Sequence, residues 1–369
     1  MRRFKSLEAR SKAVFYRLFR SLLKTGHSER IPLDPSGMQR VLFIRPDRIG
    51  DTVTSLPLFD CLRKAHPHLK LSILASTKNI SLVQHDPRFE HVFLYRRSVM
   101  KDIAEIRSIR QVGFDCVVDL LADDSVTCLF LTQLCGPVAA RLGVRKRRFA
   151  QYYDYTFHPG DDSDLHMIDI NLHMLEAFGI TERASGYATP YVDRETAERT
   201  DRYFESIRTP DISFMVGINL SQRGPNRFWG MEKWEQLTRR ILDRYPEALV
   251  VLITAPPDRE RGDKLETKFS ARVVQVEPNL DLTGISAVLS RLDILISPDT
   301  SLVHIARSFK VPVVGFYPEY KGIYRQWSPY GQPEGLVLSP GEDNIFRITV
   351  DQAIATFERL VEKNQLVAP

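Results

Sequence analysis

The sequence contains no uninterrupted run of about 18 apolar residues, so no segment of it is expected to cross a bilayer. Neither G-x-G-x-x-G nor a P-loop Gly-Lys-Ser/Thr occurs, which argues against a nicotinamide-cofactor site and against an ATPase site. Cysteine is scarce, with four in 369 residues, no Cys-x-x-Cys pair and no zinc-ligand spacing with histidine. We therefore expect buried thiols in a reducing compartment at Cys61, Cys116, Cys128 and Cys135.

The composition is that of a folded globular protein. Hydrophobic residues make up 43% and charged residues 26% of the chain, and 369 residues are enough for two domains. The net charge is +5 and its excess is concentrated, because residues 1–30 contain nine Lys or Arg against two Glu. Five further basic side chains stand close together in the chain: Arg141, Arg145, Lys146, Arg147 and Arg148.

A basic amphipathic helix is predicted within residues 1–30. Apolar side chains recur there mostly every three or four positions, and basic side chains fall between them. It is not a secretory signal, because Arg17 and Arg20 interrupt the apolar stretch and no small-residue cleavage site follows. Two interpretations stay open: the helix packs on its own domain, or it lies on an anionic membrane surface.

Strands and helices alternate along the chain, which predicts two α/β halves. In residues 38–185 the pattern predicts strands at 41–44, 69–75, 92–95, 116–120 and 140–144, and helices at 54–65, 100–111, 125–135 and 166–178. In residues 211–345 it predicts strands at 214–219, 249–254, 273–275, 292–296 and 311–316, and helices at 232–245, 259–269, 285–291 and from 301 onward. Apolar strands separated by helices are typical of parallel sheets covered on both faces.

The two halves are expected to meet near residue 185. Residues 181–211 are polar and contain two prolines, and a last helix is predicted at 349–362 with Thr349 as its N-cap. We expect a cleft between the halves, faced by the carboxyl ends of the strands of both, and such clefts are the usual ligand sites.

The most informative segment is strand, loop, helix and strand from Leu292 to Pro318. Its helix begins at Asp299-Thr300-Ser301 and carries His304 one turn in. This arrangement predicts a side-chain cap, hydroxyls and backbone N–H groups at the positive end of a helix dipole, which suit a phosphate. The alternative is an ordinary helix cap with a buried histidine.

A second candidate follows the first strand. Gly50 in a strand-to-helix turn lets the backbone approach a ligand, and Asp51 starts the next helix. A carboxylate beside a cleft is a candidate general base for an acceptor hydroxyl. The alternative is that Asp51 is only an N-cap.

The strand at 214–219 ends with Asn219, and the loop after it contains Arg223 and Arg227, which can bind a diphosphate bidentately. A solvated surface loop is the alternative. The turn from Asp281 to Gly284, which includes Thr283, precedes another helix and is a weak candidate for the same cleft edge.

Two acidic pairs resemble metal sites. Asp162 and Asp164 have an Asp-x-Asp spacing, but no apolar strand precedes them, which favours a solvated loop. Asp123 and Asp124 are explained more simply by capping of the next helix. We predict no metal and no cofactor.

Taken together, four motifs resemble glycosyltransferase family 9, the ADP-heptose:lipopolysaccharide heptosyltransferases of Gram-negative bacteria. They are I-R-x-D-R-I-G-D-T at 44–52, G-P-N-R-F-W at 224–229, D-L-T-G at 281–284 and S-P-D-T-S-L-V-H-I-A at 297–306. The resemblance runs over about residues 40–362. It implies the GT-B fold, with an acceptor-binding Rossmann-like domain at 38–185, a donor-nucleotide-binding one at 211–345, and a C-terminal helix at 349–362 that crosses back to the first.

The resemblance also implies roles for individual residues. Asp51 matches the catalytic base, and Arg227 falls where the family often has a lysine that neutralises the leaving diphosphate. Ser301 replaces a frequent glycine. The implied donor-nucleotide set is Asn219, Thr283, Gly284, Asp299, Thr300, Ser301 and His304. The implied acceptor set, for phosphorylated core sugars, is Arg48, Arg145, Arg147 and His166.

These expectations combine into an inverting, metal-independent glycosyltransferase. Its partners would be a nucleotide-sugar donor, a lipopolysaccharide inner-core acceptor and the anionic inner-membrane surface, reached from the cytoplasm through the N-terminal helix. Three alternatives stay open: a nucleotide-sugar transferase of the same fold with a different donor, a sugar-nucleotide epimerase or hydrolase of that fold, and a non-enzymatic binder of nucleic acid. Against the last, the aromatic residues of the N-terminal segment fall on its apolar face and no nucleic-acid motif occurs.

Overall fold

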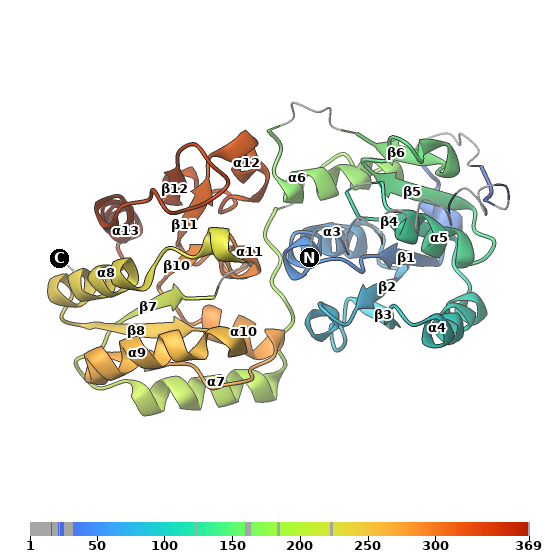
Figure 1. The fold of residues 1–369 in the computed structure, drawn as a ribbon. Helices are drawn as coiled ribbons and strands as arrows, with labels where there is room; N and C mark the ends of the chain where they lie inside the picture. The colour runs from blue at the N-terminus through green and yellow to red at the C-terminus, as the bar shows by residue number, and fades with distance from the viewer. Residues whose placement is uncertain are drawn as a thin grey trace. The chain divides into compact units, whose positions relative to one another are not determined.

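The computed structural model describes residues 16, 21, 23–25, 32–122, 124–158, 164–182, 185–221 and 224–367. The chain forms two compact units (Figure 1). Unit 1 comprises Met1–Ser163 and Ile168–Gly186, and unit 2 comprises Asp164–Met167 and Tyr187–Pro369. The helix predicted within residues 1–30 lies almost entirely outside the described residues, and no described helix is long and apolar enough to span a membrane.

Unit 1 is built on a six-stranded parallel sheet in the order β3-β2-β1-β4-β5-β6. The strands are β1 (Arg40–Ile44), β2 (Lys70–Ser76), β3 (Phe89–Tyr95), β4 (Cys116–Asp119), β5 (Ala140–Val144) and β6 (Tyr155–Phe157). The four central strands are buried almost throughout, as their continuous apolar runs predicted. The strand order reverses between β1 and β4, which makes that junction the switch point of the sheet.

The helices of unit 1 are α2 (Ile49–Val53), α3 (Leu56–Ala65), α4 (Val99–Val112), α5 (Val126–Leu134) and α6 (Met167–Leu172), the last continued by a 3-10 turn at His173–Phe178. One helix was predicted at 54–65, and the structure has two, beginning five residues earlier. The break coincides with Pro57, which has no N–H for a helical hydrogen bond and stands at the start of α3. The carbonyl of Asp51 accepts from the Arg45 guanidinium and from the hydroxyls of Thr54 and Ser55. The amide of Ser55 donates to Thr52 instead, so the helical ladder ends there.

Unit 2 repeats the topology. Its parallel sheet has the order β12-β11-β10-β7-β8-β9, so in both sheets the first strand lies between the second and the fourth. The strands are β7 (Phe214–Asn219), β8 (Ala248–Ile253), β9 (Val273–Gln275), β10 (Ile294–Pro298), β11 (Val313–Pro318) and β12 (Leu336–Ser339). Its helices are α7 (Arg194–Ile207), α8 (Met231–Arg244), α9 (Arg259–Phe269), α10 (Leu282–Leu289), α11 (Ser301–Ser308), α12 (Tyr324–Trp327) and α13 (Val350–Lys363).

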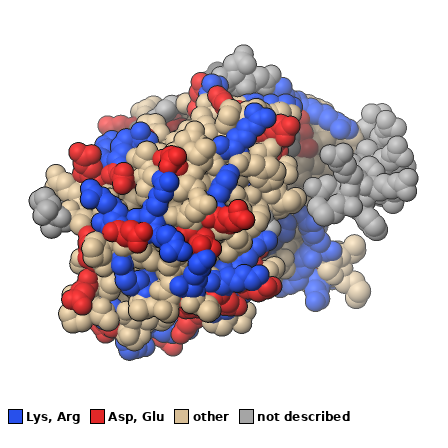
Figure 2. All heavy atoms as spheres, turned by 60° about the vertical axis from the view of Figure 1, so that its left-hand side comes forward, with Lys and Arg blue, Asp and Glu red and all other residues tan. Residues whose placement is uncertain are grey.

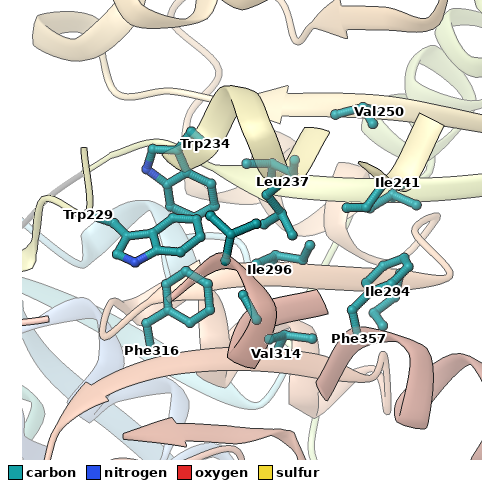
Figure 3. Packing of buried hydrophobic residues seen from close by; sticks show 14 of the residues in the cluster. Trp229, Trp234, Leu237, Ile241, Val250, Ile294, Ile296, Val314, Phe316 and Phe357 are labelled. Carbon is teal, nitrogen blue, oxygen red and sulfur yellow. The ribbon is translucent and has the colours of Figure 1, made fainter. Parts of the chain in front are cut away.

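Aromatic side chains fill the core of unit 2 on one face of its sheet. Trp229 and Trp234 pack against Phe316 with ring centroids 4.8 and 5.5 Å away (Figure 3). Phe357 of α13 and Ile241 of α8 belong to the same cluster. Both tryptophans are therefore core residues. The predicted crossing of α13 to the first domain stays a prediction, and the apolar face of this helix belongs to the core of unit 2.

The sequence pattern missed α7, the short helix α12 and the strands β6 and β12. The segment 181–211 contains α7, a mostly polar helix of which only Thr200 and Phe204 are buried, so its apolar periodicity is weak. The short strands β6 and β12 lie at the ends of their sheets. On the face shown in Figure 2, basic and acidic side chains are interspersed, as is typical of a solvated protein surface.

Candidate functional site

The predicted general base lies at the switch point of unit 1. Asp51 is in the first turn of α2, directly after β1, and its side chain is 13% exposed. Its Oδ1 lies 3.9 Å from Nη2 of Arg45, whose side chain is fully buried. The same guanidinium donates to the backbone carbonyls of Asp51 and Leu120. Arg45 therefore fixes the turn that carries Asp51 at the edge of the sheet.

A second carboxylate shares Arg45. Asp47 Oδ2 lies 3.4 Å from Nη1 of Arg45, and neither oxygen of Asp47 has a hydrogen-bond partner among the described residues. Burial raises the pKa of Asp47 to about 6, and the nearby carboxylate of Asp51 contributes in the same direction. Asp47 therefore keeps its proton to a higher pH than an ordinary aspartate, beside the candidate base.

A buried ion pair supports this edge of the sheet. Asp119 ends β4, and its Oδ2 lies 3.0 Å from Nζ of Lys146, with both side chains fully buried. Tyr153 donates to the same oxygen at 2.7 Å, and Lys146 also donates to the carbonyl of Leu121. Burial, with the neighbouring carboxylate, holds the pKa of Tyr153 well above its usual range, so the phenol stays a donor. Lys146 is thus structural, although it stands within a basic run.

The predicted acceptor residues divide between the units. Arg48 is exposed at the N-cap position of α2, and Arg147 Nε lies 2.5 Å from Nε2 of His158. Arg145 has a left-handed backbone, and burial, with Arg147, lowers the pKa of its guanidinium. These three belong to unit 1. His166 instead belongs to unit 2, so its assignment to the N-terminal domain was wrong.

The switch point of unit 2 carries the predicted donor loop. Asn219 ends β7, and its amide donates to Ser297 Oγ at 2.9 Å and to Thr300 Oγ1 at 3.0 Å. The predicted side-chain cap of α11 was wrong, because the hydroxyl of Thr300 is engaged by Asn219 and Ser297. The first turn of α11 consequently has no side-chain cap, and of its amides that of Val303 donates to the carbonyl of Thr300. Uncapped amides at a helix start suit an anion.

Arg227 lies beside this loop. Its Nε is 3.5 Å from Oδ2 of Asp299, and its Nη2 is 2.8 Å from Oδ1 of Asp343. The guanidinium is therefore held in place by two carboxylates, and Asp343 is a partner that the sequence pattern did not reveal. An arriving diphosphate would compete with these carboxylates for the same donors.

His304 is a buried residue of α11 that lies close to the rings of Trp327 and His166. Burial, with His166 nearby, lowers its pKa to about 3, so the imidazole is neutral at physiological pH. Its Nδ1 is buried without a hydrogen-bond partner among the described residues. The rings of Trp327 and His166 lie 5.6 and 5.9 Å away, and His166 donates from Nε2 to the carbonyl of Ser328. The structure therefore brings His166 to the donor residues.

The remaining predicted residues open α10. Asp281 is its N-cap and accepts from the amide of Gly284 at 2.8 Å, with Thr283 in the same turn. Helix α10 packs against α11. No group of three or more His, Cys, Asp or Glu in the described part of the chain is arranged to hold a metal ion, and Asp123 and Asp161–Ser163 lie outside that part. Metal independence stays a prediction.

The protonation of Asp47 is expected to change stability. Between its ordinary pKa of 3.8 and about 6, the native state keeps a proton that the unfolded chain releases, so its contribution falls as pH rises through this window. His304, with a lowered pKa, acts in the opposite direction. Asp47→Asn removes only the first effect. The quantity to measure is the free energy of unfolding of the wild type minus that of the variant, from urea titrations. We expect this difference to fall by about 1–3 kcal/mol as the pH rises from about 4 to 7.

A constant difference across that pH range would contradict the assignment of the titration to Asp47.

The two units define a GT-B fold, because each is a parallel sheet in doubly wound order with its candidate residues at the switch point. The sequence model of glycosyltransferase family 9 (heptosyltransferase) matches residues 103–344, and the chain belongs to this family. The resemblance expected from the motifs is thereby confirmed, although the motif at 44–52 lies outside the matched range.

Individual relatives are distant. A putative glycosyltransferase of Haemophilus influenzae is 21% identical over 343 residues, which cover 86% of this chain and 95% of the relative. The crystal structure of a family 9 glycosyl transferase from Veillonella parvula has a TM-score of 0.76 at 17% identity and covers 90% of this chain and 99% of its own. E. coli ADP-heptose lps heptosyltransferase II has a TM-score of 0.69 at 16% identity, covering 88% and 99%. At such identities the structures establish the fold alone.

Proposed function

We propose that this glycosyltransferase moves heptose from ADP-heptose onto a sugar of the lipopolysaccharide core, with inversion at the anomeric carbon and without a metal. The main support is the placement of the motif residues: Asp51 lies at the switch point of one sheet and Asn219 and Thr300 at that of the other. Family membership and the printed name of the E. coli relative support the sugar and the acceptor.

Asp51 is the general base of the proposed reaction. Its carboxylate takes the proton of the acceptor hydroxyl as that oxygen bonds to the anomeric carbon, while the bond from this carbon to the diphosphate oxygen breaks. ADP leaves with the bonding electrons, and the attack from the opposite face inverts the anomeric centre. Arg45 keeps the turn in place through hydrogen bonds to the carbonyl of Asp51, and its guanidinium lies 3.9 Å from one oxygen of the carboxylate.

The donor is held by unit 2. The uncapped amides at the start of α11 face the negative charge of the diphosphate, and the helix dipole favours that charge as it grows in the transition state. Arg227 exchanges its bonds to Asp299 and Asp343 for bonds to phosphate oxygens. The neutral imidazole of His304 offers a hydrogen bond to the nucleotide from its unpartnered side.

The acceptor is held by unit 1. Arg48, Arg145 and Arg147 offer positive charge to the phosphates of core sugars, since guanidinium groups bind phosphate bidentately. Such contacts orient the acceptor hydroxyl toward Asp51. We propose that the protein acts in the cytoplasm, at the inner-membrane surface.

Donor identity is tested by thermal unfolding with ADP, UDP and GDP and their sugar derivatives. Ligands that bind only the native state stabilise it, by roughly 2.7 kcal/mol at 100 times Kd. We expect ADP and ADP-heptose to raise Tm by several degrees at saturating concentration, and the UDP and GDP compounds to have little effect. A selective response to UDP compounds would overturn the proposed donor.

A pair of matched variants localises the site. Arg227→Gln is expected to reduce the ADP-induced shift, because one charge that contacts the diphosphate is lost. Arg239→Gln removes an equal charge from the exposed face of α8 and should leave the shift unchanged. Equal loss in both variants would indicate a general charge effect rather than a contact.

A further inference from the structure

An apolar surface without a partner among the described residues lies at the start of α4. Val99 is 77%, Met100 84% and Ile103 44% exposed, which makes them the three large exposed apolar side chains of this helix. The C-terminal half of the same helix packs into the core of unit 1: Ile109 is buried there, and Ile106 and Val112 are partly buried against it. The exposed residues therefore form a second apolar face that the fold of unit 1 does not use.

This face is surrounded by positive charge. Arg97, Lys101 and Arg107 are exposed, and none of them forms an ion pair with another described residue. The neighbouring acids are engaged inside unit 1: Asp102 accepts from the backbone amides of Arg96 and Ser98, and Glu105 accepts from Arg96 and from the amide of Leu94. We call Val99, Met100 and Ile103, together with Arg97, Lys101 and Arg107, the α4 patch.

The α4 patch is preformed. The carboxylate of Asp102 binds two amides of the connection from β3 to α4 at 2.8 Å each, and this side chain is itself buried. Arg97 in that connection has a left-handed backbone, with φ of 58°. These hydrogen bonds fix the connection to the first turn of α4, so contact with a surface would not require the segment to be ordered first.

The position of the α4 patch relates it to Asp51. Helix α4 begins at the carboxyl end of β3, and Asp51 follows the carboxyl end of β1. The strands are parallel and only β2 lies between them, so both features follow the carboxyl edge of the sheet, and the strands that lead to them are about two strand spacings, roughly 10 Å, apart. A surface that contacts the patch would lie on the same edge as the candidate base.

We infer that the α4 patch docks unit 1 on an anionic lipid bilayer. Val99, Met100 and Ile103 enter the boundary between headgroups and acyl chains, and Arg97, Lys101 and Arg107 contact lipid phosphates. The complementary charge favours a lipid surface over a second apolar protein face. The biological role of this docking rests on the proposed function. A lipid-linked acceptor would then arrive at the edge of the sheet that carries Asp51.

Vesicle binding by the full chain tests the inference without any assay of transfer. We expect binding to vesicles of phosphatidylethanolamine with a quarter of phosphatidylglycerol, and much weaker binding to phosphatidylcholine vesicles. Val99→Asp with Met100→Asp should reduce partitioning at least about tenfold, because buried apolar area is lost and negative charge is added. Acidic residues are favourable in the first turn of a helix, so we expect the Tm of this variant to equal that of the wild type.

Two matched controls separate the patch from general effects. Leu134→Ser changes an exposed apolar residue of α5 and should bind as wild type, whereas Met100→Ser should bind more weakly. Lys101→Gln should weaken binding about fivefold, and Lys64→Gln, with the same loss of charge on α3, should not.

Three outcomes would overturn the inference. The first is unchanged vesicle binding by the Val99→Asp and Met100→Asp variant, which would assign binding to another part of the chain such as the basic residues 1–30. The second is absence of binding by the wild type. The third is concentration-dependent self-association that the variant abolishes, which would make the patch a protein interface.

Transfer assays keep this inference distinct from the proposed function. With an acceptor sugar that carries no lipid, the patch variant should keep the wild-type rate; with acceptor embedded in vesicles, its rate should fall. If neither the wild type nor the variant transferred sugar under any condition, the proposed function would be wrong. The vesicle-binding result would still hold. A patch variant that is equally slow with both acceptors would contradict the membrane role.

Discussion

Replacing Asp51 with asparagine is expected to lower kcat by about 10²- to 10⁴-fold while leaving the fold and donor affinity intact. Asparagine has nearly the same shape but cannot take the acceptor proton. The hydrogen bonds that hold this position go to the backbone carbonyl, which accepts from Arg45, Thr54 and Ser55, and asparagine keeps that carbonyl. The side chain adds only an ion pair to Arg45 at 3.9 Å. The measurements are kcat with ADP-heptose and a core acceptor, together with the Tm shift produced by ADP.

A matched control for this variant is Asp60→Asn, which changes an aspartate of α3 in the same unit whose side chain is 52% exposed. It should retain the wild-type kcat. If Asp51→Asn kept more than about a tenth of wild-type kcat, Asp51 would not be the general base. A fall in Tm in the asparagine variant alone would instead indicate a structural role.

Lys146→Met is expected to destabilise the protein by about 3–5 kcal/mol. The change leaves the carboxylate of Asp119 buried without its cation, and Tyr153 alone cannot compensate the charge. The methionine side chain is close in volume to the aliphatic part of lysine, so loss of packing is a minor component. Urea titration of the wild type and the variant near neutral pH measures the difference.

The double variant Lys146→Met with Asp119→Asn is the control. Neutralising both partners removes the uncompensated charge, so the double variant should recover a large part of the stability lost in the single one. Equal stability of Lys146→Met and wild type would show that the pair contributes nothing. An additive further loss in the double variant would contradict the account of a buried carboxylate.

Local sequence patterns predicted most elements because burial in a parallel sheet leaves a direct signal. The apolar runs around Val41, Val117, Val250 and Leu295 are strands in the structure, and the helix predicted at 259–269 has the same ends as α9. The pattern failed where this signal is weak. The helix α7 is polar apart from a narrow stripe, and the boundary between α2 and α3 stands at Pro57, within the single helix that was predicted.

The candidate site divides in the same way. Asp51 and Thr300 were identifiable because a short sequence motif places each one directly after a strand, where the switch points of these sheets lie. Their partners were not: Lys146 appeared to be one of a run of surface cations, and Asp343 lies far from Arg227 in the chain. His166 was assigned to the wrong unit, since the chain enters unit 2 for only four residues there.

By itself the sequence determined the two α/β halves, the family, and the position in the chain of the residues with candidate chemical roles. These properties depend on which residues are neighbours in the chain, and the sequence gives that information directly. Only the tertiary structure decided which charges are buried and paired, that Thr300 bonds to Asn219 instead of capping α11, and that Val99 and Met100 remain exposed. The physical reason is that burial and pairing depend on segments distant in the chain, which come together only when the sheets and helices pack.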